Sequence, residues 1–291
     1  MPEASPLPGT WGPHGCRAAV SVTFDNLGEA ADLERGLWPS NKPLGQHPSV
    51  THALPAILEM LQELSLHATF FIEGLSVEMY HAAISEIIKD GHEIGSHAWR
   101  HEAWQQLDAA QEEQILKRSI AALAKSGIRP RGFRPPGGGL TSTSSRLYKE
   151  VGFTYCSPSS AHARTGIADG LVFLPFEWRC VDAFYYLAHF GDLRALHGEP
   201  YDTLPASYLY TAMHSALEEC IQQGSYLSFI FHPFLEEDGE RIEVMRSLLK
   251  ELRDCAQDDI VWCAPCGEIA GWMLEHPKDF TTTLPLHPGQ Q

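Results

Sequence analysis

The sequence predicts an α/β protein, a (β/α) barrel built on about seven parallel strands. Short apolar runs rich in β-branched residues alternate with segments of helical periodicity from residue 18 to residue 262, as in parallel sheets covered by helices on both faces. Seven or eight such units fit a barrel better than two separate domains. Polar residues follow four strand ends, at Asp25, His97, Arg134 and His232. Because the active sites of parallel barrels lie at the carboxyl ends of the strands, this pattern predicts one pocket.

The first half of the chain supplies three of the strands. The apolar run 18–24 comes first and ends at the polar pair Asp25-Asn26. A loop interrupted by glycine and proline occupies 36–49. Apolar residues then recur at helical or strand spacing, and the expected elements in order are helix 54–64, strand 68–72, a helix over 84–88 ended by Gly91, strand 93–96, and a helix over 116–123 ended by Gly127.

The second half begins at a short strand, Gly132-Phe133-Arg134. It leads into Pro135-Pro136-Gly137-Gly138-Gly139, which cannot be helix or interior strand. The strongly apolar strand 226–231 ends at His232-Pro233. The other elements expected here are helix 144–151, strands 153–156 and 171–174, helices 213–221 and 242–252, and strand 260–262.

The composition excludes several classes of protein. The chain has 291 residues, with 21 Lys and Arg against 37 Asp and Glu, so its formal net charge is −16. Proteins that bind the phosphate backbone present stripes of Lys and Arg, so we expect no nucleic-acid partner. No apolar run reaches the length of about 18 residues that a membrane span needs, so we expect no membrane partner. The fifteen histidines stand out, because neutral histidine is a frequent metal ligand.

The chain is expected to divide into an irregular arm (1–15), one barrel domain (16–275) and a tail (276–291). Seven irregularly spaced cysteines are a poor disulfide framework, and no secretory signal is visible in the first residues. We therefore expect a cytoplasmic protein. The pair Cys263 and Cys266 lacks the second pair that a tetrahedral zinc site needs. Association into a homo-oligomer is left open by the sequence.

Hydrolysis of a stable amide needs an electrophile that polarises the carbonyl, a base for the attacking water and an acid for the leaving amine. His97 and His101 are four residues apart, and on a helical turn they would lie about 6 Å apart and converge on one ion. Two surface histidines can show the same spacing, and a carboxylate such as Asp25 at a strand tip often only caps a helix. Taken singly, these residues leave both interpretations open.

Five motifs occur along the chain in an order that resembles the polysaccharide deacetylase (NodB-homology) family. They are Thr23-Phe24-Asp25-Asn26, Ala68-Thr69-Phe70-Phe71, Gly91-His92-Glu93-Ile94-Gly95-Ser96-His97 with His101, Phe133-Arg134-Pro135-Pro136-Gly137, and Phe229-Ile230-Phe231-His232. The resemblance spans residues 18–265. It implies a distorted (β/α) barrel and a hydrolase of carbon–nitrogen bonds other than peptide bonds.

The resemblance also implies a role for each catalytic residue. Asp25 corresponds to the general base, Arg134 to the arginine that orients it, and His232 to the general acid. In secreted members an aspartate commonly follows the late histidine, whereas here Pro233 does. The carboxylate that tunes His232 is therefore expected from elsewhere, and Asp182 is the best candidate.

The metal ligands that the resemblance implies are Asn26, His97 and His101. The family normally has an aspartate at the position of Asn26, and an amide oxygen adds no charge, so the expected Zn²⁺-like ion is held less tightly. Three interpretations follow. The metal binds through Asn26 and both histidines, or Asp25 moves in as the anionic ligand, or the site works without metal, as in related allantoinases that open small cyclic amides. We favour the metal because both histidines are retained.

Trp99, Pro136 and Tyr185 stand within or beside these motifs, and we expect them to contact the substrate. The aromatic residues fit the hydrophobic core equally well. The segments 36–49 and 184–207 are candidate lids. A narrow pocket under lids favours a small molecule over a polymer chain.

These inferences predict a metal-dependent hydrolase, an N-deacetylase that acts on a small soluble N-acylated substrate. The alternative on the same fold is a metal-independent hydrolase of a small cyclic amide or imide. A third interpretation is a catalytically inactive barrel that only binds a ligand. Asn26 favours it, whereas the retention of Asp25, Arg134 and His232 argues against it.

Overall fold

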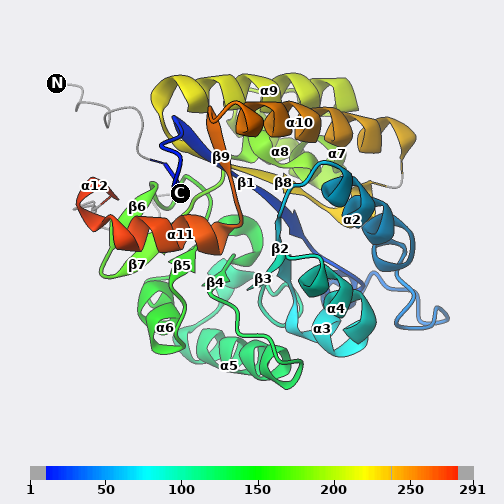
Figure 1. Ribbon diagram of the computed structural model, residues 1–291. Helices are drawn as coiled ribbons and strands as arrows, with labels where there is room; N and C mark the ends of the chain where they lie inside the picture. The colour runs from blue at the N-terminus through cyan, green and yellow to red at the C-terminus, as the bar shows by residue number, and fades with distance from the viewer. Residues whose placement is uncertain (1–10, 237, 281–291) are drawn as a thin grey trace.

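One curled sheet of nine strands forms the centre of the molecule (Figure 1). The computed structural model describes residues 11–236 and 238–280. Along the sheet the strands follow the order β6-β7-β5-β4-β3-β2-β1-β8, and β9 also pairs with β1. Their bounds are β1 Ala18–Asp25, β2 Thr69–Ile72, β3 Glu93–Ser96, β4 Gly132–Phe133, β5 Tyr155–Cys156, β6 Gly166–Ala168, β7 Leu171–Phe173, β8 Tyr226–Phe231 and β9 Val261–Cys263.

Every ladder in the sheet is parallel except that between β6 and β7. On β1, which pairs with β2, β8 and β9, Asp25 lies beside Phe71 of β2, and Phe24 lies beside Phe231 of β8. Parallel strands end at the same edge of a sheet, so the residues that follow β1, β3, β4 and β8 meet there. The predicted α/β fold with a distorted barrel is confirmed. The sheet curls into a half-barrel, and the antiparallel strand β6 is an addition to the predicted elements.

Helices pack around this sheet (Figure 1). The long helices α9 and α10 lie side by side, and α9 also contacts β8 and β1. No helix within the described residues is long and apolar enough to cross a membrane. The helices are α1 Ala30–Glu34, α2 Leu54–Glu63, α3 Gly74–Met79, α4 His81–Lys89, α5 Ala109–Lys125, α6 Ser144–Glu150, α7 Asp182–Tyr186, α8 Gly191–Leu196, α9 Ala206–Gln223, α10 Gly239–Gln257, α11 Cys266–Glu275 and α12 Pro277–Phe280.

Local sequence sets the ends of the long helices. Asp108 begins α5 with a capping box, because its side chain accepts from the backbone N–H groups of Ala110 and Gln111 while the Gln111 side chain accepts from the N–H of Asp108. Later in the chain, α9 stops at Gly224, whose φ of 67° lies in the left-handed region that favours glycine. β8 begins two residues later and carries the chain directly to His232.

The loop after β1, one of the predicted lids, is tied to the core. The buried carboxylate of Glu29 accepts hydrogen bonds from the Tyr80 hydroxyl and from the backbone N–H of Gly45, the latter at 2.6 Å. The backbone N–H of His47 donates in turn to the Tyr80 hydroxyl at 2.9 Å. These contacts hold the loop against the body of the barrel beside the end of β1.

The second predicted lid, 184–207, is organised around one buried arginine. Arg194 of α8 is fully buried. Its guanidinium donates to backbone carbonyl oxygens, which belong to Phe184, Leu187, Pro200 and Tyr201. Because these carbonyls come from both ends of the segment, the side chain folds the segment back on itself.

Residues 11–15, the described part of the predicted arm, pack on the barrel. Trp11 is buried, and its indole N–H donates to the carbonyl oxygen of Gly224 at 2.9 Å. Its ring centre lies 4.9 Å from that of Phe280, in α12. The first and last described residues are thus neighbours. The domain boundaries after residues 15 and 275 stay predictions.

Replacing Arg194 with Met would leave several backbone carbonyl oxygens buried without a donor, at a cost of about 1–3 kcal/mol each. We expect the free energy of unfolding, measured by urea denaturation, to fall by about 3 kcal/mol or more. The control is Arg146→Met, whose partly exposed pair with Glu150 should contribute under about 0.5 kcal/mol. A loss as small as that of the control would show that the segment does not depend on Arg194.

Candidate active site

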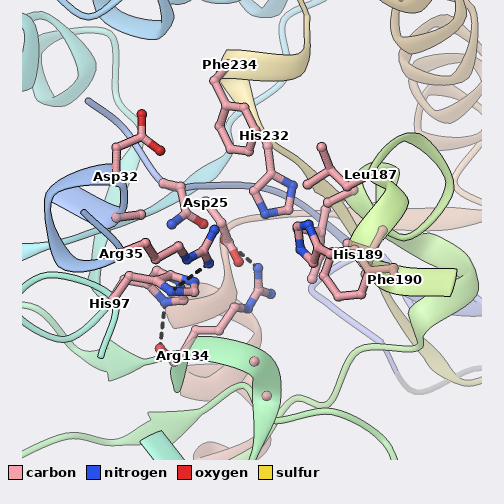
Figure 2. Close-up of a pocket in the computed structure, with 18 of the residues that line it drawn as sticks. Asp25, Asp32, Arg35, His97, Arg134, Leu187, His189, Phe190, His232 and Phe234 are labelled. Carbon is pink, nitrogen blue, oxygen red and sulfur yellow. Dashed lines mark hydrogen bonds and ion pairs between the residues drawn. The ribbon is translucent and has the colours of Figure 1, made fainter. Parts of the chain in front are cut away.

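A cavity of about 490 Å³ opens at the carboxyl ends of the strands (Figure 2). The structure brings the predicted base, acid and metal-ligand candidates to its wall, namely Asp25, Asn26, His97, His101, Arg134 and His232. Both predicted lids border it as well. The segment 36–49 contributes Leu37 and His47, and the segment 184–207 contributes Leu187, His189 and Phe190. Arg35, just before the first of these segments, also lines the cavity.

Arg134 holds Asp25 in place. It follows β4 and is 1% exposed. Its Nη1 donates to Oδ1 of Asp25 and to the hydroxyl of Thr23, both at 2.7 Å. The Nε and Nη2 groups donate to the hydroxyls of Ser157 and Ser228. Charge-assisted hydrogen bonds of this kind fix both position and direction, so the carboxylate is presented to the cavity in one orientation.

His232 follows β8 and pairs with Asp182, the first residue of α7. Its Nδ1 lies 2.5 Å from Oδ1 of Asp182, and its backbone N–H donates to Oδ2 at 2.6 Å. Burial opposes protonation of the ring, but the charge of Asp182 and this hydrogen bond outweigh burial, so the pKa of His232 is raised. Burial and then the charge of Asp182 also raise the pKa of the neighbouring Glu236. The pair of His232 and Asp182, the dyad of this site, therefore favours the protonated imidazole.

The histidine pair sits on a turn, so the helical geometry considered from the spacing is wrong. Ala98 has a φ of 65° and His101 a φ of 70°, both in the left-handed region. The Glu102 carboxylate closes the turn by accepting from the two backbone N–H groups that precede His101, at 3.1 and 3.0 Å. The ring centres of His97 and His101 are 5.0 Å apart. Left-handed conformations at residues other than glycine often occur at functional sites.

Hydrogen bonds assign the proton of each ring. Nδ1 of His97 lies 2.7 Å from the carbonyl oxygen of Arg134, which can only accept, so Nδ1 carries the proton and Nε2 keeps its lone pair. Nδ1 of His101 lies 3.3 Å from Nη2 of Arg35, which can only donate, so this Nδ1 accepts. Burial lowers the pKa of both rings, that of His97 to about 3. Both rings are neutral near pH 7, and His101 carries its proton on Nε2.

Asn26 is matched to a buried carboxyl group. Its φ is 61°, and its Nδ2 donates to Oε1 of Glu73 at 2.9 Å. Glu73 is 1% exposed, and its Oε2 has no hydrogen-bond partner in the described part of the chain. Burial raises the pKa of Glu73 to about 8. The amide of Asn26 supplies this buried carboxyl group with a hydrogen-bond donor, which an ionised aspartate at position 26 would not.

These contacts do not fit a bound divalent cation. Asn26 offers a neutral amide oxygen, Asp25 is engaged by Arg134, and the lone pair of Nδ1 in His101 accepts from a guanidinium. Within residues 11–236 and 238–280, no group of three or more His, Cys, Asp or Glu residues is arranged to hold a metal ion. Structural and catalytic zinc sites use such converging ligands. The donor set therefore does not support the zinc ion expected from the resemblance.

The predicted substrate contacts are not brought together. Pro136 lines a neighbouring cavity of about 410 Å³. Trp99 is buried, with its ring centre 3.9 Å from the Arg118 guanidinium. Tyr185 is fully buried, and its hydroxyl donates to the carbonyl oxygen of Arg179 at 3.1 Å. Trp99 lines a separate cavity of about 190 Å³, and Tyr185 lies in α7 with its ring in the core. Neither residue lines the cavity that holds Asp25 and His232, which corrects the expectation that they contact the substrate there.

Sequence reasoning missed Arg35, His189, Glu73 and Glu236. Arg35 lies just before the predicted lid 36–49 and His189 lies in the lid 184–207, and no local pattern indicates which side chain of these segments reaches the cavity. Glu73 follows β2 directly, just as the polar pair follows β1. That position at a strand end was a usable signal. Glu236 lies four residues after His232 and carries no comparable signal.

Comparison with known proteins adds to this geometry. The family model described as polysaccharide deacetylase matches residues 15–156. Peptidoglycan deacetylase from Helicobacter pylori is 30% identical over 125 residues, which are 43% of this chain and 39% of that protein. The match thus spans well under two thirds of the length of this curated relative.

Solved structures match over nearly the whole chain. A putative polysaccharide deacetylase from Mycobacterium smegmatis superposes with a TM-score of 0.78 at 28% identity, covering 97% of this chain and 99% of that one. An allantoinase superposes with a TM-score of 0.74 over 95% of this chain and 99% of its own, and at 19% identity it shows the fold alone. With the five ordered motifs and the matching family model, the conclusion is that the chain belongs to the polysaccharide deacetylase family.

Proposed function

We propose that this protein hydrolyses a carbon–nitrogen bond, other than a peptide bond, in a small molecule. The observation that carries the proposal is the presence in one cavity of a carboxylate held by Arg134 and an imidazole held by Asp182. The charge of Asp25 contributes to the raised pKa of His232, so the two side chains are close enough to act on the same bound molecule. A volume of about 490 Å³ suits a small-molecule ligand.

In the proposed reaction a water molecule adds to the carbonyl carbon of the substrate. Asp25 accepts a proton from this water as the new C–O bond forms and the carbonyl oxygen gains negative charge. The C–N bond then breaks, and His232 gives its Nε2 proton to the departing nitrogen. The proton on Asp25 passes to solvent and His232 takes one up, so each turnover consumes one water and restores both groups.

The donor set favours metal-independent hydrolysis of a cyclic amide or imide over metal-dependent N-deacetylation. Nε2 of His97 can accept a hydrogen bond, whereas Arg35 and Nε2 of His101 can donate. An imide or a ureide presents an N–H donor next to a carbonyl acceptor, which complements this arrangement. N-Deacetylation of a small N-acylated substrate is the second candidate, because the same base and acid would serve it. Location in the cytoplasm stays a prediction.

Two variants test the assigned roles on a panel of probes: hydantoin and succinimide for ring opening, and N-acetylglucosamine for deacetylation. His232→Ala and Asp25→Asn are each expected to lower kcat by on the order of 10²–10⁴, because each removes one proton transfer. The control is His81→Ala, at an exposed residue outside the cavity, which should turn over normally. A wild-type protein that cleaves no probe, with or without added Zn²⁺, would favour an inactive binding barrel.

The pH dependence tests the dyad. His232 acts in its protonated form, so activity is present below its pKa and is lost as the pH rises through it. Asp182→Asn removes the charge that raises this pKa, so the alkaline limb of kcat/KM should move to lower pH. The matched control is Glu251→Gln, which alters a carboxylate paired with His214 instead. A limb that stays in place or moves to higher pH would contradict the assignment.

A further inference from the structure

Arg35 brings a guanidinium into the centre of the cavity. The residue ends α1, and its backbone N–H donates to the carbonyl oxygen of Ala31 at 3.1 Å. Its side chain extends toward Asp25 and His97 (Figure 2), and its Nη2 donates to Nδ1 of His101. The adjoining loop is fixed through Glu29. The position of this cation therefore follows from the fold of the segment that links β1 to α2.

Arg35 is the cation that the site leaves without an acidic partner. Among the described residues, no carboxylate oxygen lies within 4.0 Å of its guanidinium nitrogens. The two acidic residues that line the cavity have other partners, Arg134 for Asp25 and His47 for Asp32, the latter at 3.5 Å. Asp182, beside the cavity, is paired with His232. A positive charge thus faces neutral imidazoles and the open volume.

We propose that Arg35 is the electrophilic group of this site and stands where the family's metal ion would act. Its guanidinium binds the carbonyl oxygen of the scissile amide and stabilises the negative charge that this oxygen gains when water adds. The proton on Nε2 of His101 supplies a second donor, which the contact between Arg35 and Nδ1 requires. The inference rests on the proposed C–N hydrolysis.

Two features of the chain exclude a divalent cation from the same place. The positive charge of Arg35 repels it, and the contact with His101 uses a lone pair that a metal would need. Asn26 provides a neutral amide where the family has an anionic ligand. The nearest carboxyl group behind this amide is that of Glu73, which is buried and accepts from Asn26. The double substitution Asn26→Asp/Glu73→Gln exchanges the two functional groups and keeps one hydrogen bond between them. It therefore moves the carboxyl group from the buried position to the cavity.

Zinc binding tests the inference without any substrate. We would titrate ZnCl₂ into the wild type, Arg35→Ala, Arg35→Lys and the triple variant Arg35→Ala/Asn26→Asp/Glu73→Gln by calorimetry, and measure zinc after dialysis by elemental analysis. The wild type and Arg35→Lys should retain no stoichiometric zinc. Arg35→Ala should bind at least about tenfold more tightly than the wild type, and the triple variant should retain about one ion. Adding His97→Ala should remove that ion, whereas Arg146→Ala, at an exposed arginine, should behave as the wild type.

Two results would overturn the inference. One is a wild type that retains one zinc ion which His97→Ala removes. The other is a triple variant with a native circular dichroism spectrum that retains none. If the triple variant does not fold, the comparison of Arg35→Ala with Arg35→Lys decides, because residue 35 is exposed and equal affinities would contradict the proposal.

Turnover of whichever probe is cleaved tests the positive role. Arg35→Ala should lower kcat by about 10²–10³, the usual cost of one donor to an oxyanion, Arg35→Lys should lose less, and guanidinium chloride should restore part of the activity of Arg35→Ala. A kcat within twofold of the wild type would overturn this role even if hydrolysis by Asp25 and His232 stands. The absence of hydrolysis by every variant and the wild type would instead contradict the proposed function, and the zinc measurements would remain valid.

Discussion

The buried ion pair between Arg134 and Asp25 is the contact on which the rest of the site depends. The two residues come from β4 and β1, which are separated in the sheet by β2 and β3. The guanidinium therefore crosses the interior of the curled sheet, and through Ser157 and Ser228 it also reaches the end of β5 and the middle of β8. The backbone carbonyl oxygen of Arg134 also positions His97, because it accepts a hydrogen bond from Nδ1 of that ring. Without Arg134, Asp25 would be a buried charge with no partner, which is strongly destabilising.

The charged groups of the site are paired with one another, with the exception of Arg35. Arg134 and Asp182 are buried and serve side chains of the protein. Glu73 is kept protonated near neutral pH by burial and faces Asn26. Arg35 is exposed and has no acidic partner among the described residues, so it determines the electrostatic field that a substrate meets. Asn26 fits its surroundings because its amide donates to the buried carboxyl group of Glu73.

Much of this arrangement could be predicted from the sequence, because strand ends mark the site. The apolar runs identify the strands, and the polar residues after them converge at Asp25, His97, Arg134 and His232. Asp182 was found by resemblance, and it does contact His232. What the sequence could not supply depends on contacts between distant segments. The extension of the Arg35 side chain into the cavity depends on the loop that is anchored at Glu29. The direction of the rings of Trp99 and Tyr185, the left-handed turn at 98–101 and the short strand β6 likewise have no periodic signal.

Turnover after removal of metal tests most directly whether the cation of this site is Arg35. Protein purified without added metal would be dialysed against a chelator, and kcat/KM for the cleaved probe would be measured before dialysis, after it, and after addition of one equivalent of Zn²⁺. An Arg35 site predicts the same kcat/KM in all three samples. Loss of activity on dialysis and its recovery with Zn²⁺ would contradict this assignment and return the site to metal-dependent hydrolysis.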